Sequence, residues 1–203
     1  MDESAAELDA LIERMLADYV AHNKAASVLK DMLDETGVGL YPVVDHLTLR
    51  TSDIDLRAQE FTALGYVYAE TLHFTDWYAK VYRKTGYPAL FVDQAYLDDR
   101  GGTSIIPGWV HRFGDAAFHH IAIRVEDIEA AIARLSAKGI SFSGPIVGER
   151  GGALRQIFSA PEIKNGQAFS VLELAERHRG YQGFSPPQAD SLMKSSAATR
   201  SGS

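Results

Sequence analysis

An internal repeat constrains the fold of this chain more than any other feature of its sequence. A segment that begins at Asp45 reads DHLTLRTSDIDLRAQEFTALG, and a related one, FHHIAIRVEDIEAAIARLSAKG, begins at Phe118. At an offset of 74 positions the two segments share a histidine, an arginine, an aspartate, an isoleucine and a glycine. The aligned pairs are His46 and His120, Arg50 and Arg124, Asp53 and Asp127, Ile54 and Ile128, and Gly65 and Gly139. Chance rarely keeps such different residue types in one frame, so the repeat indicates a duplicated supersecondary unit.

Each copy begins with the same succession of elements. The apolar alternation of HLTLR and HIAIR has a period of two residues, which predicts a strand. An acidic helix start, an amphipathic stretch of about three turns and a closing glycine then predict a helix, and a second strand follows at once. Two more apolar segments, at 77–84 and 89–95, extend the first copy to β-α-β-β-β, and the second copy repeats that order.

These patterns predict an α+β protein in which two βαβββ modules form a curved mixed sheet. The predicted boundaries are 1–40 for an N-terminal helical region, 41–97 for module 1, 98–117 for a linker loop, 118–187 for module 2 and 188–203 for a disordered tail. The helical stripe of the first region breaks near His22 and Asn23. We expect this region to pack on the outside of the sheet, and a homodimer interface there is left open as the alternative.

The bulk composition excludes several classes of function. The 203-residue chain has a net charge of −7, a pI near 5.5 and no basic run, so nucleic acid is not an expected partner. It has no cysteine, which excludes a disulfide framework, a thiolate metal site and a cysteine nucleophile. The acidic opening and the lack of an apolar run of about 18 residues argue against a secretory signal and a membrane partner. A soluble cytoplasmic protein is therefore expected.

Histidine and arginine share one face of the first strand in each module. Residues two apart in a strand point the same way, so His46 and Arg50 project together, as do His120 and Arg124. The intervening apolar residues face the helices, which turns the polar ones toward the concave side. On the last strand of module 2, Glu173 is a carboxylate between apolar neighbours and needs a partner. Two imidazoles and a carboxylate from three strands would form the facial triad of non-haem iron sites, so the sheet is expected to curve around a metal site.

The duplicated modules resemble a known superfamily. Histidine on the first strand of each module and glutamate on the last strand of the second are features of the vicinal oxygen chelate superfamily, which includes glyoxalases and dioxygenases. The resemblance covers roughly residues 43–177, about two thirds of the chain. The stretches FHHIAI, LRQIFSAP and FSVLELAER are similar to the C-terminal half of 4-hydroxyphenylpyruvate dioxygenase. DHLTLR behind a helical region, and GYQGFSPPQADSLM near the end, look more like the iron-dependent 2-oxoadipate dioxygenase/decarboxylase family.

The resemblance implies a ligand set and a reaction. His46, His120 and Glu173 would hold Fe(II), and Zn, Mn or Ni are ions that a purified sample could also carry. The expected function is a non-haem Fe(II)-dependent dioxygenase/decarboxylase. Its expected substrates are O₂ and a 2-oxo acid, specifically a small dicarboxylic one similar to 2-oxoadipate.

The same resemblance assigns residues to substrate binding. Arg50 would bind the far carboxylate, because it lies four strand residues from His46, about 13 Å along the strand. Gln156, in the Gln-Ile-Phe run, would contact the substrate or orient a ligand. Arg124, the counterpart of Arg50 in module 2, is a further candidate for substrate binding.

Alternatives remain open at this point. His119 adjoins His120 but points to the opposite face, so it would be a neighbour of the site or a replacement ligand. Glyoxalase-type members use a carboxylate from the last strand of module 1 as a fourth ligand, and there Asp93 and Gln94 point to opposite faces. If Asp93 faced the metal, a metal-dependent isomerase or lyase would be favoured. A metal-free small-molecule binding protein of the same fold is the third interpretation.

Overall fold

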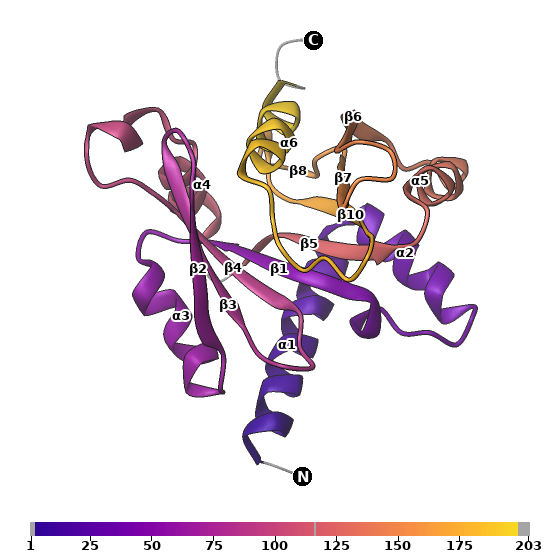
Figure 1. Cartoon of the computed structure of the whole chain (residues 1–203), viewed down its shortest axis with the longest axis horizontal. Coiled ribbons are helices and arrows are strands. Elements are labelled where there is room, and N and C mark those ends of the chain that lie inside the picture. The colour runs from indigo at the N-terminus through magenta and orange to yellow at the C-terminus, as the bar shows by residue number, and fades with distance from the viewer. Residues whose placement is uncertain (1–2, 116, 199–203) are drawn as a thin grey trace. The chain divides into compact units, whose positions relative to one another are not determined.

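The computed structural model describes residues 3–115 and 117–198 and divides the chain into two compact units. The first unit comprises Met1–Tyr19 and His46–His119, and the second comprises Val20–Asp45 and His120–Ser203. Each unit contains one βαβββ module, which confirms the predicted α+β fold class (Figure 1).

The first unit is built on strands β1 to β4 and helix α3. The bounds are β1 Val44–Arg50, α3 Ile54–Ala63, β2 Val67–His73, β3 Trp77–Arg83 and β4 Ala89–Ala95. The strand order is β2-β3-β4-β1. Strand β1 pairs with β4 in parallel, whereas β3 is antiparallel to both of its neighbours. The crossover through α3 is what allows the parallel pair, since a parallel pair cannot be joined by a tight turn.

The second unit repeats this arrangement. The bounds are β5 Phe118–Val125, α5 Ile128–Ala137, β6 Phe142–Val147, β7 Leu154–Ser159 and β10 Val171–Arg177. The order is β5-β10-β7-β6, with β5 and β10 parallel. A short hairpin, β8 Ile163–Lys164 and β9 Gln167–Ala168, is inserted before β10. Its turn contains Asn165 and Gly166, both at positive φ, as the Asn-Gly pair predicts.

The helix of each module starts at an aspartate cap and is also held by the last strand. Asp53 accepts a hydrogen bond from the Leu56 N–H at 3.0 Å, and Asp127 accepts one from the Ala130 N–H at 2.8 Å. The first N–H of α3 donates to Gln94 at 2.8 Å. In α5, the equivalent N–H donates to Glu176 Oε2 at 2.7 Å. We call the face of each sheet that lies opposite α3 or α5 its inner face.

Two helices precede the modules. Helix α1 spans Glu3–His22 and α2 spans Lys24–Asp34, which confirms the predicted break near His22 and Asn23. Asn23 caps α2 by accepting from the Ala26 N–H at 2.9 Å, and its amide donates to Ser170 Oγ at 3.1 Å. A 3₁₀ turn, Tyr41–Val43, then leads into β1. Helix α1 up to Tyr19 belongs to the first unit and α2 to the second, so the predicted helical region contributes to both units.

The segment predicted as a linker loop contains helical structure. A 3₁₀ turn spans Asp99–Thr103, and helix α4 spans Ile106–Phe113. Pro107 stands in the first turn of α4, where its missing N–H has no helical partner to lose. Ile106 and Trp109 are buried on one side of the helix. The Gly- and Pro-containing composition of this segment predicted a loop, but residues 106–113 form a short amphipathic helix.

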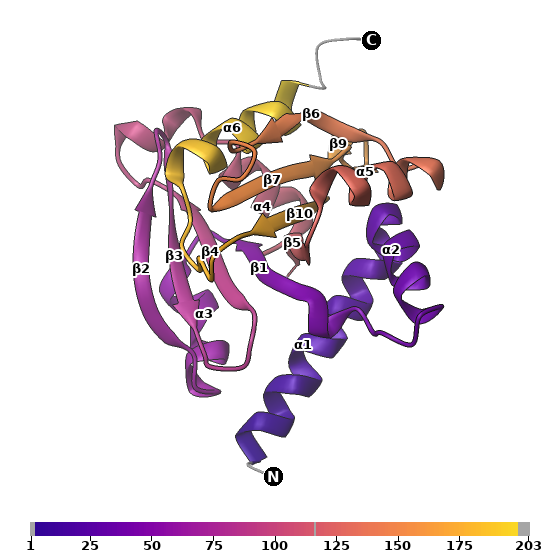
Figure 2. The ribbon, with the colours of Figure 1, turned by 45° about the vertical axis from the view of Figure 1, so that its right-hand side comes forward.

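The segment predicted as a disordered tail also differs, because helix α6 spans Pro186–Ala198. Leu192 of α6 is 2% exposed and packs with Phe158 of β7 and Val171 of β10. Figure 2 shows α6 beside strands β6 and β7 of the second unit. Val171 lies on the inner face, since it is two residues from Glu173. Leu192, with Met193 packed beside it, thus anchors a segment whose Ser- and Ala-rich composition predicted disorder. Residues 199–203 of the predicted tail lie outside the described part of the chain.

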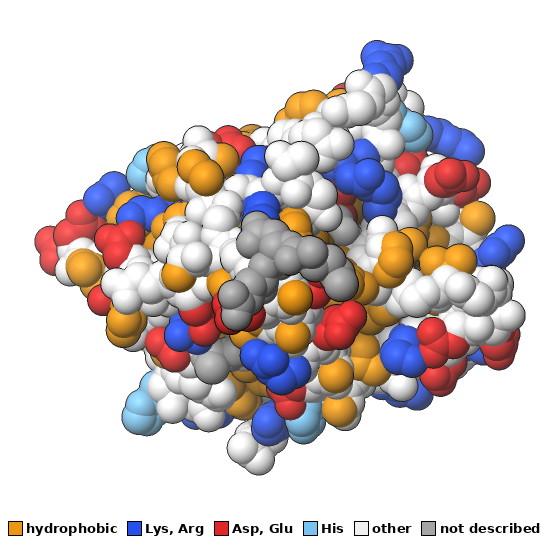
Figure 3. All heavy atoms as spheres, turned by 90° about the horizontal axis from the view of Figure 1, so that it is seen from below, with side chains coloured by type: hydrophobic (Ala, Val, Ile, Leu, Met, Phe, Trp, Pro, Cys, Tyr) orange, Lys and Arg blue, Asp and Glu red, His pale blue; other side chains and the backbone are white. Residues whose placement is uncertain are grey.

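The described helices form no membrane span and, on the face that Figure 3 draws, the described residues show no segregation of charge. Among the described helices, none is long and apolar enough to cross a membrane. Figure 3 shows acidic and basic side chains intermixed with apolar ones over the face that is seen from below. On that face they form no single-sign stripe of the kind that follows a nucleic-acid backbone.

Candidate functional site

The inner face of the second sheet carries a histidine and a carboxylate side by side. His120 Nε2 lies 3.3 Å from Glu173 Oε2, and both side chains are almost completely buried. His120 is on β5 opposite Val171 of β10, so Glu173 is two residues further along the neighbouring strand on the same face. The Phe158 ring packs against His120 with ring centroids 5.2 Å apart.

Gln156 holds the other oxygen of the same carboxylate. Its Nε2 donates to Glu173 Oε1 at 2.5 Å from the adjacent strand β7. The Oε2 atom is left on the side of His120. This arrangement supports the prediction that Gln156 orients a ligand, because its hydrogen bond fixes which carboxylate oxygen is presented.

The donor set fits a divalent metal ion. Two ligand atoms about 2.1 Å from one ion and at about 90° to each other are separated by about 3 Å, which is close to the separation of His120 Nε2 and Glu173 Oε2. Imidazole nitrogen and carboxylate oxygen suit iron, zinc and manganese alike. A buried carboxylate also requires a compensating partner, and an ion would supply it.

The inner face of the first sheet holds the other predicted histidine. His46 is 3% exposed on β1, and its ring packs against Phe91 with centroids 5.0 Å apart. Arg50, four residues further on, is 2% exposed, and its guanidinium carbon lies 5.5 Å from the centre of the Trp109 ring. A cation over an aromatic face is a favourable contact when both groups are withdrawn from water.

Asp93 stands beside Arg50 on the neighbouring strand. The two residues are Cα partners in the parallel pair of β1 and β4, so their side chains share the inner face. Burial raises the pKa of Asp93 to about 7, and the charges of Arg50 and His46 oppose this rise. Asp93 Oδ1 has no hydrogen-bond partner among the described residues.

Three other predicted residues have partners elsewhere. Gln94 points to the opposite face from Asp93 and caps α3. Arg124 donates to Asp45 Oδ1 at 3.1 Å, and its side chain is 52% exposed. His119 packs edge-on against Trp109, with ring centroids 5.9 Å apart. None of these contacts joins them to the His120 and Glu173 pair.

Trp109 is a residue near the candidate site that no motif of the sequence singled out. It lies in α4, is 6% exposed and contacts both Arg50 and His119. The available signal was the spacing of Ile106, Trp109 and Phe113 at three and four residues, which marks one face of a helix.

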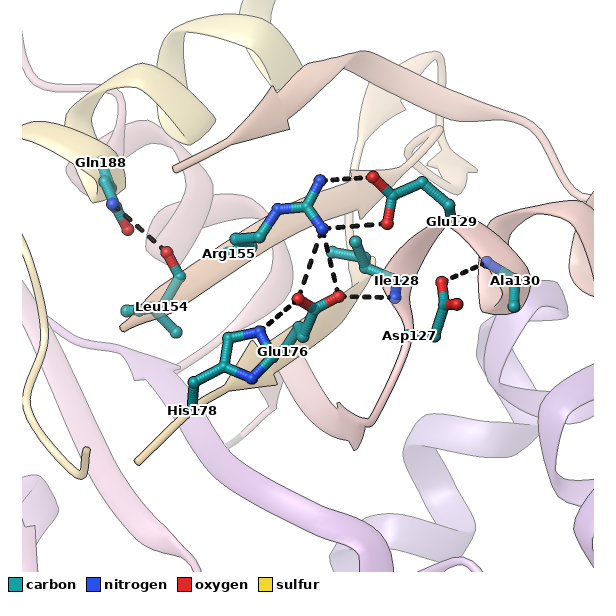
Figure 4. A network of polar contacts seen from close by, with 9 residues as sticks. All are labelled: Asp127, Ile128, Glu129, Ala130, Leu154, Arg155, Glu176, His178 and Gln188. Atoms are coloured by element: carbon teal, nitrogen blue, oxygen red, sulfur yellow. Dashed lines mark hydrogen bonds and ion pairs between the residues drawn. The ribbon is translucent and has the colours of Figure 1, made fainter. Parts of the chain in front are cut away.

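A second acidic cluster lies on the helix side of the second sheet. Asp127, Glu129 and Glu176 bring their carboxylates close together, but Arg155 pairs with Glu129 and Glu176, and Asp127 caps α5 (Figure 4). Arg155 donates to Glu129 at 2.6 and 2.9 Å and to Glu176 at 3.3 Å. His178 Nε2 also lies 2.6 Å from Glu176. We interpret this network as the attachment of α5 to strands β7 and β10.

Charge and hydrogen bonding in this network shift the acidic groups. The hydrogen bond from Arg155 lowers the pKa of Glu129 to about 2. Burial acts to raise the pKa of Glu176, but the Ile128 N–H, His178 and Arg155 together hold it below its usual range. Both carboxylates are therefore ionised at neutral pH and committed to Arg155.

Comparisons with known proteins agree with this fold. Rice (Oryza sativa) hydroxyglutarate synthase in complex with 2-oxoadipate has a TM-score of 0.80 at 17% identity, covering 98% of this chain and 95% of that one. A Shewanella frigidimarina NCIMB 400 protein described provisionally as a hydrolase has a TM-score of 0.73 at 18% identity, with coverage of 87% and 96%. A mutant 4-hydroxymandelate synthase from Streptomyces coelicolor has a TM-score of 0.66 at 19% identity, covering 80% of this chain and 57% of that one.

These likenesses concern the fold, because all three identities are below one fifth. No curated protein matches the sequence. Residues 94–157, from the end of module 1 into module 2, match the family described as Glyoxalase/Bleomycin resistance protein/Dioxygenase superfamily. The match falls on the repeat that carries His120 and Gln156, and the paired βαβββ modules are the architecture expected of it. Residues 94–157 are therefore similar to the Glyoxalase/Bleomycin resistance protein/Dioxygenase superfamily, and the α+β fold of the described chain is consistent with it.

Proposed function

We propose that this chain is a non-haem Fe(II)-dependent dioxygenase/decarboxylase that acts on a small dicarboxylic 2-oxo acid. The proposed ligands are His120 and Glu173 of the second unit together with His46 of the first. The observation that carries the proposal is the buried pair of His120 Nε2 and Glu173 Oε2, 3.3 Å apart, with Gln156 fixing the second carboxylate oxygen. Duplication supports His46, since it occupies the same strand position as His120.

A set of three protein ligands is supported by the strand registers. His46 is opposite Ala89 and His120 is opposite Val171, so the counterpart of Glu173 in module 1 is Phe91. Asp93 matches Ala175 instead, one inner-face position further along. The place of a symmetrical fourth ligand is thus filled by an apolar ring, which favours the dioxygenase over the glyoxalase-type isomerase or lyase.

The protein's own residues would bind and orient the substrate. Bound iron would supply the Lewis acidity and redox chemistry that activate O₂ and the oxo acid. Gln156 keeps Glu173 in its binding orientation, and Phe158 shields His120 from water. Arg50 would hold the far carboxylate, because a guanidinium can form a bidentate pair with it and Trp109 withdraws that charge from solvent.

The substrate class rests on two considerations. A buried arginine on the same strand face as His46 suits a ligand with an anionic group at each end. Hydroxyglutarate synthase, the fold neighbour with a TM-score of 0.80, was solved with 2-oxoadipate, an oxo acid of that kind. We therefore propose a substrate of similar length, with O₂ as the second substrate.

Metal analysis and oxygen uptake test this proposal. Protein purified without chelator is expected to contain one iron per chain, and 2-oxoadipate is expected to cause O₂ consumption coupled to CO₂ release. The variant His120→Ala should lose both, while His111→Ala, at an exposed position of α4, should keep both. Turnover under anaerobic conditions would instead indicate an isomerase or lyase. Absence of any stoichiometric metal would indicate a metal-free binding protein.

A further inference from the structure

The strand ends that carry Arg50 and Asp93 bring two buried charged residue types together within the first unit. Arg50 ends β1, and its parallel partner on β4 is Asp93. Both are 2% exposed, and Trp109 covers the guanidinium from one side. A cation and a carboxyl group are therefore buried next to each other on the inner face of one sheet.

One carboxyl oxygen of Asp93 lacks a hydrogen-bond partner, which suggests that a ligand binds there. Its Oδ1 atom has no hydrogen-bond partner within residues 3–115 and 117–198. A buried carboxyl oxygen without a partner costs about 1–3 kcal/mol, so such atoms are uncommon unless something binds there. The equivalent position of module 2 is Ala175, so the repeat itself does not require a carboxyl group at this site.

We propose that Asp93 is a specificity-determining residue that binds the far carboxylate of the substrate together with Arg50. In this arrangement Asp93 is a neutral carboxylic acid and donates a hydrogen bond to one oxygen of the carboxylate that Arg50 binds. The inference rests on the proposed role of Arg50 as the carboxylate-binding residue.

Charge balance explains why the proton belongs on Asp93. Arg50 contributes one positive charge and the substrate carboxylate one negative charge, so a neutral Asp93 leaves the buried group uncharged overall. An ionised Asp93 would place two carboxylates against one guanidinium away from water, which is strongly unfavourable. Burial, which raises the pKa of Asp93 to about 7, makes protonation accessible near neutral pH.

The proposal predicts a ligand class and a pattern of substitutions. The far group must accept hydrogen bonds from both residues, so a carboxylate is favoured over an amide or a methyl group of the same chain length. Asp93→Asn keeps the shape, has no charge and can donate from its NH₂ group, and it should therefore preserve binding. Asp93→Ala removes the donor and should weaken the binding of dicarboxylates alone.

Equilibrium binding to the metal-loaded protein without oxygen tests this, with 2-oxoadipate, its far-end monoamide and 2-oxohexanoate as probes. The wild type is expected to bind 2-oxoadipate at least about tenfold more tightly than the other two probes, which corresponds to one or two hydrogen bonds to a charged group. Asp93→Asn should keep this preference within about threefold, and Asp93→Ala should reduce it by about tenfold. The preference is a ratio within one protein, so a loss of folded protein does not imitate the result.

Three outcomes overturn the inference while leaving the proposed function intact. The first is a wild-type preference that persists in Asp93→Ala, and the second is equal weakening of all three probes in Asp93→Ala, which would indicate a structural role. A preference lost in Asp93→Asn as fully as in Asp93→Ala would also contradict the hydrogen-bond donor role. If the wild type bound none of the three oxo acids, the proposed function would fail, and this inference with it.

Discussion

The last strands of the two modules, β4 and β10, are alike on one face and different on the other. Toward the helices, Gln94 and Glu176 each accept a hydrogen bond from the first N–H of their own helix, at 2.8 and 2.7 Å. On the inner face, Phe91 of β4 stands where β10 has Glu173. The comparison teaches that the helix-facing side of both modules holds the helix in the same way, whereas the inner face carries different side chains in each.

The matched arginines show the same divergence. Arg50 and Arg124 occupy equivalent positions of the repeat. Arg50 is buried beside Asp93 and Trp109, whereas Arg124 is half exposed and pairs with Asp45. Identity at equivalent positions therefore does not imply an equivalent role, because the surroundings decide which group each guanidinium meets.

The largest expected effect comes from removing the inner-face carboxylate of module 2. Glu173→Ala should lose bound metal and reduce oxygen uptake by at least about a thousandfold, since one of the proposed ligands is gone. Phe91→Ala, the matched change in module 1, should retain the metal. Metal content after dialysis measures both variants. Retention of metal by Glu173→Ala would show that the carboxylate is not a ligand.

A large effect on stability is expected from the helix-facing carboxylate of the same strand. Glu176→Ala removes the acceptor of the Ile128 N–H and leaves Arg155 with one carboxylate in place of two, so we expect a loss of about 3 kcal/mol in the free energy of unfolding. Gln94→Ala removes a neutral acceptor and should cost about 1 kcal/mol. Urea denaturation provides the comparison. Equal losses would mean that the Arg155 network adds nothing to the cap.

The matched arginines provide the third comparison. Arg50→Met should raise the dissociation constant of 2-oxoadipate by about a hundredfold, because a charged hydrogen-bonding partner is lost from a buried position. Arg124→Met should change it by less than about threefold, since this arginine pairs with Asp45 and is half exposed. Calorimetric titration of both variants with 2-oxoadipate measures the two dissociation constants. A larger effect at Arg124 would reverse our assignment of the substrate-binding arginine.

The smallest effect concerns the acids in the first helical turns. Glu129 binds Arg155, and its counterpart Asp55 binds Lys80. The pKa of Glu129 is lowered from 4.5 to about 2, so its contribution to stability is complete above pH 4.5 and is lost as the pH falls toward 2. The stability difference between the wild type and Glu129→Gln should therefore shrink over that interval. Thermal denaturation at several pH values measures it, and a difference independent of pH would exclude the ion pair as the cause.

The repeat made much of the fold predictable. Polar caps at equal spacing marked both helix starts, and Asp53 and Asp127 do cap their helices. Period-two patterns located the strands, because alternation along a strand follows directly from backbone geometry. The break at Asn23 was also predictable, since asparagine is a preferred capping residue.

The partners of individual side chains were less predictable. Strand alternation placed Arg124 on the face of His120, yet nothing local indicates that Asp45, 79 residues away, would pair with it. Alternation also separated Asp93 from Gln94 without showing which of them faces the helix. That choice depends on the register between β1 and β4, which is a long-range property.

Short helices escaped prediction for a related reason. Helix α4 is anchored by Ile106 and Trp109, and α6 is held on the sheet through Leu192. Their stability comes from tertiary packing of a few apolar side chains and not from their local composition. Such contacts can be recognised only when the structure of the surface on which each helix packs is known.

The docking of α6 has a bearing on how the protein could be inactivated. Leu192 packs with Phe158, which in turn packs against the ring of His120, so the helix buttresses the candidate site on the same face of the sheet. Proteolytic cleavage in the connection 178–185 would release that wall and admit water next to the imidazole. A nick in a connection that carries none of the proposed ligands would then be expected to abolish the proposed activity and to expose an apolar surface prone to aggregation.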